Sequence, residues 1–161
     1  MDSQKRIAQL VEELKLQPHP EGGFFAETYR STEMLETESG KRNLATVIYF
    51  LLTSENHSNF HRIKSDEHWF WHEGNHLSIH ILGEKGHQVL SLGPVGNSDC
   101  SPQQLVPANT IFGSTVEGTD SYALVSCMVA PGFDFQDFEL MNAEQLLTAF
   151  PDAEEIIRKL T

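Results

Sequence analysis

Short apolar runs recur along most of this chain, and turn residues separate them. From residue 67 on, the runs read EHWFWH, HLSIHIL, HQVLSLG, QQLV, TIFGSTV, YALVSCMV and FDFQDFEL. Turn signals such as Gly83-Glu84-Lys85-Gly86 and Pro131-Gly132 stand between them. Strand-like runs separated by turns at intervals of roughly 8 to 12 residues are typical of a β-sandwich or barrel. The pattern therefore predicts an all-β fold.

The first third of the chain adds two further strands. Phe24, Phe25 and Tyr29 indicate one of them. The β-branched and aromatic run at 44–53 indicates a central strand that is buried on both faces. The polar stretch between them, STEMLETESGKR at 31–42, is expected to be a loop.

Both ends of the chain are predicted to be helical. Apolar residues at helical spacing predict an amphipathic helix over residues 3 to 15, which packs on the outside of a sheet. Near the other end, Asn142 and Gln145 stand in the positions of a capping box, and Asp152 and Glu155 repeat that pattern. We therefore expect one N-terminal helix and short C-terminal helices around a single domain that spans 1–161.

Composition excludes several classes of partner. The 161 residues carry a formal net charge of −12, and such a surface repels phosphate backbones and anionic lipid headgroups. Neither nucleic acid nor a membrane is expected as a partner. The two cysteines, Cys100 and Cys127, form no CxxC motif. They read as reduced thiols of a cytoplasmic protein.

One stretch, SNFHRIKSDEHWFWHEG at 58–74, concentrates polar chemistry around two tryptophans. Side chains of a strand alternate between its faces. If 67–72 is a strand, one face carries Glu67, Trp69 and Trp71, and the other carries His68, Phe70 and His72. His61 must then reach the same region from a separate segment, so the histidines do not all converge.

The spacing of His61, Glu67 and Gly74 reproduces most of the first cupin motif, GxxxxxHxHxxxExxxxxxG, and Pro107 fits the second, GxxxxxPxGxxHxxxN. The chain resembles a cupin, and more closely a small cupin family of unassigned function. That family carries HPEGGF, FHR…DE.W and CMVAPGFDFQDFEL. All three stretches occur here, at His19–Phe24, Phe60–Trp69 and Cys127–Leu140, and the resemblance spans roughly residues 15 to 150.

The resemblance implies a double-stranded β-helix, in which two antiparallel sheets pack as a jelly roll around a pocket. This agrees with the strand pattern. It also implies a homodimer in which the partner covers sheet edges.

Metal-binding cupins use two histidines and a glutamate of the first motif and one histidine of the second. Here His61 and Glu67 match, but Ile63 and Phe112 replace the other two ligands. Two ligands are fewer than the three of catalytic zinc sites or of the iron facial triad. We therefore predict no cofactor. If a divalent metal does bind, His61 and Glu67 hold it, with a third donor from His80, His72 or Glu21.

Without a metal, His61 is the candidate acid/base, because an imidazole titrates near neutral pH, and Glu67 is the group expected to orient it. The expected ligand-binding side chains are those of Glu21, Tyr29, Arg30, Trp69, Trp71, Phe112 and Ser114. The set is similar to that of the dTDP-sugar 3,5-epimerases, which are metal-free cupins with a histidine base at the position of His61.

Three functions remain open beside a purely structural or storage role. The first is a metal-independent isomerase or epimerase that acts on a sugar-like or carbonyl compound. The second is a small-molecule-binding protein with no chemistry, which the same aromatic pocket would serve. The third is a metal-dependent hydrolase or dioxygenase with an unexpected third ligand. Bound metal, bound ligand and turnover would separate them.

Overall fold

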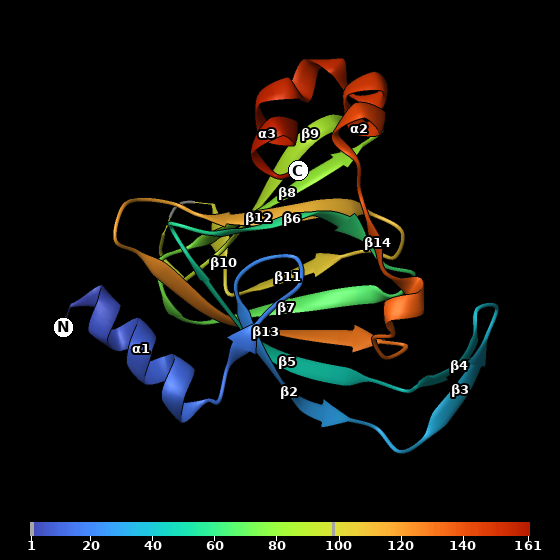
Figure 1. Cartoon of the computed structure of the whole chain (residues 1–161), viewed down its shortest axis with the longest axis horizontal. Coiled ribbons are helices and arrows are strands. Elements are labelled where there is room, and N and C mark those ends of the chain that lie inside the picture. Colours follow the sequence, from blue (N-terminus) through green and yellow to red (C-terminus); the bar gives the residue numbers. More distant parts are fainter. Residues whose placement is uncertain (1, 98) are drawn as a thin grey trace.

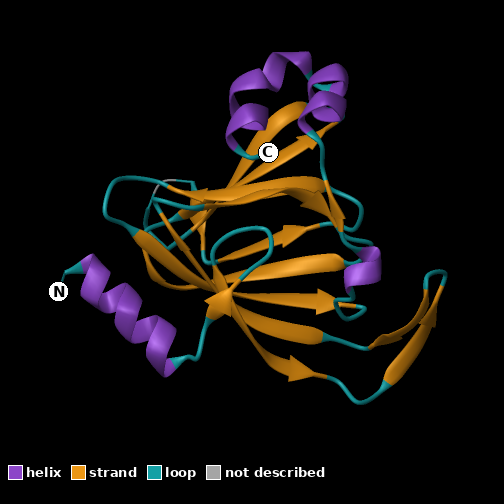
Figure 2. Ribbon diagram, viewed as in Figure 1, coloured by secondary structure: helices purple, strands orange, loops and turns teal. Residues whose placement is uncertain are grey.

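The computed structural model describes residues 2–97 and 99–161, and its strands form two facing six-stranded sheets (Figures 1 and 2). The first sheet has the order β1 (Gln17–Pro18), β2 (Phe24–Arg30), β5 (Thr46–Thr53), β13 (Tyr122–Ala130), β7 (Asp66–Gly74) and β11 (Gln103–Val106). The second has the order β10 (Cys100–Ser101), β9 (Gly86–Leu92), β8 (Leu77–Gly83), β12 (Ile111–Val116), β6 (His57–Arg62) and β14 (Glu139–Leu140). This double-stranded β-helix confirms the all-β prediction.

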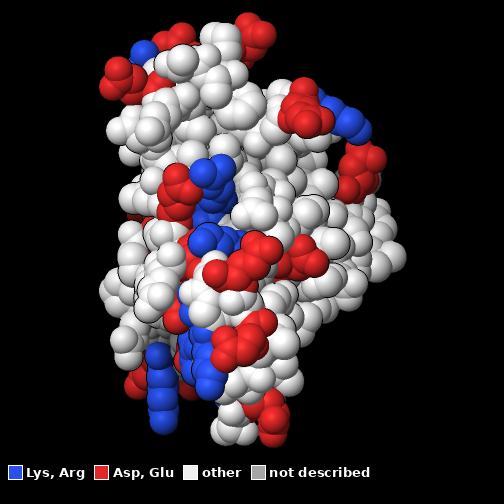
Figure 3. All heavy atoms as spheres, turned by 90° about the vertical axis from the view of Figure 1, so that its right-hand side faces the viewer, with Lys and Arg blue, Asp and Glu red and all other residues white. Residues whose placement is uncertain are grey.

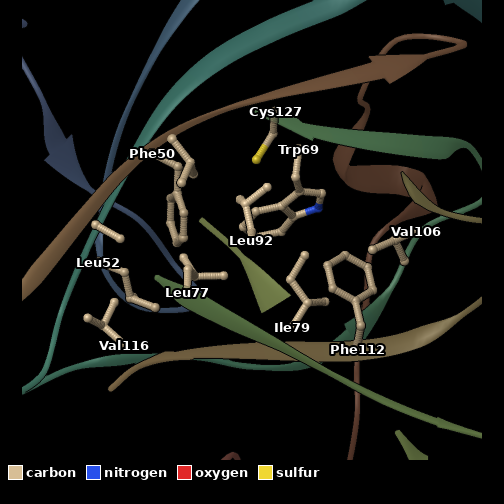
Figure 4. Packing of buried hydrophobic residues seen from close by; sticks show 12 residues of the cluster. Phe50, Leu52, Trp69, Leu77, Ile79, Leu92, Val106, Phe112, Val116 and Cys127 are labelled. Carbon is tan, nitrogen blue, oxygen red and sulfur yellow. The ribbon is translucent and has the colours of Figure 1, made fainter. Parts of the chain in front are cut away.

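The main core fills the space between the sheets, and Figure 4 shows its side chains pointing toward one another from both. Alternation along β5 explains the burial of that strand on both faces. Phe50 and Leu52 point into this core, whereas Leu51 packs on the outer face against Leu10 of the N-terminal helix. The predicted central strand is therefore confirmed.

Helices cover the outer face of each sheet, which confirms the predicted packing of the N-terminal helix. Helix α1 (Ser3–Glu13) lies on the first sheet. The second sheet is covered by α2 (Ala143–Ala149), the short η2 turn (Pro151–Ala153) and α3 (Glu154–Lys159). Asn142 caps α2 by accepting hydrogen bonds from the backbone N–H groups of Glu144 and Gln145. The repeat of that pattern at Asp152 is wrong, because α3 has no side-chain cap.

Two segments differ from their predicted structure. The stretch 31–42, expected to be a loop, contributes most of a two-stranded arm, β3 (Met34–Thr37) and β4 (Gly40–Asn43), which extends away from the sheets in Figure 1. The sequence of the arm lacks the alternation of apolar and polar residues that predicts a strand, because neither face of the arm packs on a hydrophobic core. The run at 133–140, expected to be a strand, is mainly the 3₁₀ turn η1 (Phe135–Asp137) followed by the two residues of β14.

An ion pair ties the arm to η1. The guanidinium group of Arg42, 5% exposed, donates two hydrogen bonds to the carboxylate of Asp137, at 2.8 and 2.9 Å. A bidentate pair of this kind fixes orientation as well as distance. The turn that follows β13 is thereby held in place.

Both cysteines are free thiols, and Cys127 is buried. None of the described helices is long and apolar enough to cross a membrane. Figure 3 looks onto the right-hand side of Figure 1, where acidic and basic side chains are intermixed rather than gathered into a patch of one sign. The predicted lack of nucleic-acid and membrane partners stays a prediction.

Candidate functional site

A cavity of about 750 Å³ opens at one end of the space between the sheets. Its wall comes from strands β2, β5, β6, β7 and β13 and from the segments that precede β2 and follow β13. The polar lining consists of Lys15, Gln17, His19, Glu21, Glu27, Thr28, Arg30, Thr46, His61, Glu67, Cys127 and Asp134. The apolar lining includes Phe25, Ile48, Ile63, Val129, Phe133 and Phe135. Such a mixture of apolar walls and a few converging polar groups is usual for a small-molecule site.

A tight turn before β2 carries Glu21 into this cavity. Gly22 and Gly23 have φ values of +113° and +77°, which L side chains rarely adopt. Gly22 also lies so close to β6 that a Cβ there would overlap the carbonyl oxygen of His57. The backbone N–H of Asn59 donates to the carbonyl oxygen of Glu21 at 3.0 Å. The two glycines therefore allow the turn to dock against the strand that carries His61.

His61 and Glu21 meet inside the cavity, where Nε2 of His61 lies 3.1 Å from Oε2 of Glu21. The other ring nitrogen, Nδ1, lies 2.7 Å from the backbone oxygen of Asn59. A carbonyl oxygen can only accept, so Nδ1 must carry a proton. In the neutral ring Nε2 then carries the lone pair, and a proton on the Glu21 carboxyl group avoids repulsion between two lone pairs at this distance.

Burial supports this proton placement. His61 is 3% exposed, and burial lowers its pKa to about 4. Burial also raises the pKa of Glu21 to about 8. A desolvated group disfavours its charged form, whichever sign that charge has. At neutral pH both partners are therefore mainly uncharged, with one proton shared between an oxygen and a nitrogen.

Glu67 is a second buried carboxyl group of the cavity. Burial raises its pKa to about 8, and the nearby charge of Glu21 adds to the rise. We expected Glu67 to orient His61. In the structure Glu67 lies beside the thiol of Cys127, and the carboxyl group that contacts His61 is that of Glu21. The reason is that the Gly22–Gly23 turn docks on β6 and so brings Glu21 next to His61. Glu21 is thus near both of the other buried titratable groups, His61 through a 3.1 Å contact and Glu67 through its effect on that group's pKa.

Most of the predicted aromatic ligand contacts support the cavity from outside it. Trp69 and Phe112 are 3% and 1% exposed and belong to the main core, with Trp71 packed against it. The Phe112 ring lies 4.3 Å from that of His61, centroid to centroid, and so backs the imidazole. Ser114, which lies on β12 like Phe112, is fully buried. Within the described chain, none of these four side chains lines the cavity.

A β-bulge decides between Tyr29 and Arg30, the two residues expected at the mouth. Glu27 pairs with Ile48 and Tyr29 pairs with Val47, so Thr28 is an extra residue in β2. The bulge reverses the alternation of side chains beyond it. Arg30, opposite Thr46, therefore points toward the cavity, whereas Tyr29 is 53% exposed.

The residues present do not fit a metal of the kind that many cupins hold. Both nitrogens of His61 already have partners, and Ile63 and Phe112 are buried without a lone pair to offer. Two expected third donors lie elsewhere. His72 contacts Ser126 on the outer face of the first sheet, and His80 lies on the second sheet. Across residues 2–97 and 99–161, no three His, Cys, Asp or Glu side chains are arranged to hold a metal ion.

The sequence did not predict several polar residues of the cavity, among them His19, Glu27 and Cys127. His19 lines it and accepts a hydrogen bond from the backbone N–H of Glu21 through Nδ1, at 3.1 Å. Cys127 and Glu27 complete its wall. Two signals were available. His19 opens the HPEGGF stretch, and Cys127 alternates with inward-facing valines in YALVSCMV.

Several known proteins resemble this chain over most of its length. An uncharacterized protein of Saccharomyces cerevisiae, YML079W, is 31% identical over 172 residues, which cover 88% of this chain and 78% of that protein. The structure of a hypothetical protein from Leishmania major superposes with a TM-score of 0.89 at 36% identity, over 96% of this chain and 97% of that one. Protein SO0799 from Shewanella oneidensis superposes with a TM-score of 0.87 at 39% identity, over 95% of each chain.

A family model described as Cupin_5, Cupin superfamily (DUF985), matches residues 8–141. That range includes the HPEGGF turn, His61 and Glu67. The chain belongs to this Cupin_5 family of the cupin superfamily.

Proposed function

We propose that this protein binds a small, sugar-like or carbonyl compound and isomerises or epimerises it without a metal. The observation that carries the proposal is the 3.1 Å contact between His61 Nε2 and Glu21 Oε2 inside a 750 Å³ cavity. Titratable groups whose environments shift their pKa values in opposite directions are frequent at catalytic sites. Here burial lowers the pKa of His61 and raises that of Glu21.

The proton shared by His61 and Glu21 allows the pair to produce a carboxylate base. When the Glu21 proton passes to His61 Nε2, the Glu21 carboxylate is left facing the cavity. That carboxylate removes a proton α to the substrate carbonyl, and the C–H electron pair becomes part of an enolate. Glu21 then returns the proton to the neighbouring carbon, which isomerises the compound, or to the same carbon after the enolate has turned its other face to Glu21, which epimerises it. His61 remains the acid/base group of the sequence prediction, and Glu21 carries its proton to and from the substrate.

Glu67 supplies the acid of this scheme. A carboxyl group with a pKa of about 8 is mainly protonated at neutral pH. It therefore donates a hydrogen bond to the carbonyl oxygen as negative charge develops there. Ionisation of Glu21 opposes that of Glu67, since each charge raises the other group's pKa. The site thus keeps one base and one acid in the same turnover.

The wall favours a ligand with little net charge. Arg30 lines the cavity, but it donates two hydrogen bonds to the carboxylate of Glu27, at 2.6 and 3.3 Å, and one each to Asn43 and Phe133. An arginine whose N–H groups already donate in this way is poorly placed to form a bidentate pair with a phosphate. Phe25 and Ile48 form apolar wall near the acids. A ketose-like compound suits this wall better than a nucleotide sugar.

The test is solvent exchange at carbon. Protein in D₂O is incubated with fructose, xylulose or hydroxyacetone, and loss of the α-proton signal is followed by ¹H NMR. His61→Asn and Glu21→Gln should each slow exchange by roughly 10² to 10⁴, with the fold intact by circular dichroism. His72→Asn, on the outer face of the first sheet, is the matched control. Equal exchange in all variants would contradict the proposal.

The second candidate function is that of a non-catalytic small-molecule-binding protein. The apolar side chains that line the cavity, such as Phe25 and Ile48, favour it. It predicts that one of these compounds raises the melting temperature without any exchange. The Phe25→Ala variant should then lose the shift, because the ligand loses wall contact, whereas Glu21→Gln should retain most of it.

A further inference from the structure

A chain of polar side chains crosses the outer face of the second sheet, away from the cavity. His87 of β9 meets His80 of β8, with Nε2 and Nδ1 3.0 Å apart. His80 Nε2 lies 2.8 Å from Oγ1 of Thr115 on β12. The Thr115 hydroxyl in turn lies 3.4 Å from a carboxylate oxygen of Glu117. Alternation along the strands places these groups on the face opposite the core residue Ile79.

The direction of these hydrogen bonds settles the tautomer of His80. A carboxylate only accepts, so the Thr115 hydroxyl donates to Glu117. The threonine oxygen then accepts from His80, which therefore carries its proton on Nε2. The lone pair of His80 is consequently on Nδ1, and it points at His87. Hydrogen bonding of one ring nitrogen to a carboxylate-linked group is how proteins orient metal-ligating histidines.

Burial makes His80 a fixed and uncharged donor. It is 8% exposed, between two hydrogen-bonded neighbouring strands. His87 is exposed, so packing leaves its ring room to turn. One imidazole is thus held and the other is adjustable.

The spacing of the two nitrogens matches adjacent positions on a metal ion. Metal–nitrogen bonds to imidazole are about 2.0–2.1 Å long, so two nitrogens at a right angle lie about 2.9 Å apart and at a tetrahedral angle about 3.4 Å. Square-planar and octahedral geometries, with right angles, are those of copper(II) and nickel(II). His87 also borders a hollow of about 370 Å³ with Glu84 and Asp152, which leaves room for water ligands.

We propose that His80 Nδ1 and His87 Nε2 form a two-histidine site for a borderline divalent cation, with copper(II) bound in preference to nickel(II) and zinc. The stronger affinity for copper follows the general order of these ions at nitrogen ligands. Water completes the coordination. The site lies on the outer face of the second sheet and shares no residue with the cavity, so it stands whether or not the cavity is catalytic.

The experiment uses the full chain without a polyhistidine tag, titrated with copper(II). We expect one ion per chain by calorimetry and an electron paramagnetic resonance spectrum with hyperfine structure from two imidazole nitrogens. His87→Gln should weaken binding at least tenfold. Because His87 is exposed, this variant keeps the fold. Thr115→Val, which leaves both ligands in place, should weaken binding by roughly 10- to 100-fold, since the orienting hydrogen bond is lost.

His68→Gln is the matched control, because His68 lies on the outer face of the first sheet beside Phe70. It should bind copper like the unmodified protein. Absence of binding by the unmodified protein, or equal binding by His87→Gln, would overturn the proposal. Equal binding by Thr115→Val would overturn the orienting role of the threonine.

Discussion

His61 Nε2 lies 3.1 Å from Glu21 Oε2, and the two residues come from different elements, strand β6 and the turn before β2. Since Nδ1 of His61 donates to Asn59, the shared proton lies between the carboxyl group and Nε2. Burial lowers the pKa of His61 to about 4. We therefore expect ¹⁵N NMR to find His61 neutral, with its proton on Nδ1, from pH 5.5 to 7.5. A ring that titrates near pH 6.5 would contradict this placement.

Gly22 makes this contact possible, and replacing it should cost stability. A Cβ at this position would overlap the carbonyl oxygen of His57, and φ is +113°. Gly22→Ala should lower the free energy of unfolding by at least about 1–3 kcal/mol, the usual cost of a strained backbone. Urea denaturation measures it. Gly86→Ala is the control, because Gly86 has φ +77° but nothing within 4 Å of a Cβ.

The close approach at Gly22 predicts that its variant loses more stability than the Gly86 variant. Equal losses would mean that strain in φ alone matters and that the turn does not press on β6.

Glu67 should make the protein less stable as the pH rises. Its pKa is about 8 in the folded protein, against 4.5 for an ordinary glutamate, so the folded state binds more protons between those values. The stability that it contributes is complete below pH 4.5 and is lost as the pH rises through 8. From pH 6.5 to 8.5, the free energy of unfolding of Glu67→Gln should therefore fall less steeply than that of the unmodified protein.

The buried histidines do not change the pH dependence of the free energy of unfolding between pH 6.5 and 8.5. Burial lowers the pKa of His19 and of His61 from 6.5 to about 4, so their contribution is present above pH 6.5 and is lost as the pH falls through 4. Glu55→Gln, an exposed carboxyl group, is the control and should leave the slope unchanged. The same slope for Glu67→Gln and the unmodified protein would show that Glu67 ionises normally.

Metal content separates the cavity from the His80–His87 site. We expect that copper, nickel or zinc found in tag-free protein by plasma mass spectrometry is retained in Glu67→Ala and lost in His87→Gln. The reason is that Nδ1 of His61 is already hydrogen-bonded to Asn59 and Nε2 lies 3.1 Å from Glu21. Loss of stoichiometric metal in Glu67→Ala would instead place a metal in the cavity. It would then favour the hypothesis of a metal-dependent hydrolase or dioxygenase.

The homodimer implied by the family resemblance is a further prediction. The β3–β4 arm exposes Met34 and Leu35, at 51% and 43%, near the exposed Tyr29 of β2. Burial of such apolar side chains stabilises an interface. Light scattering should give twice the chain mass of 18.1 kDa, and Leu35→Glu should reduce it to the monomer. Leu105→Glu, 42% exposed on β11, should not; the reverse result would place the interface on the other edge.

The sequence determined the fold class, the family and the cavity's location. Alternating apolar residues and turns predicted the strands, because burial of one face imposes a period of two. Asn142 predicted the cap of α2, since capping depends on neighbouring residues alone. The motif spacing placed His61 and Glu67 in one region, and both line the cavity.

Tertiary structure decided which groups meet. The bulge at Thr28 depends on pairing between β2 and β5, and it exchanges the faces of Tyr29 and Arg30. The partner of His61 is Glu21 because the Gly22–Gly23 turn docks on β6, a contact between segments distant in the sequence. The paired histidines His80 and His87 meet through strand register in the same way. Local pattern fixes alternation and caps, whereas pairing and docking fix the site.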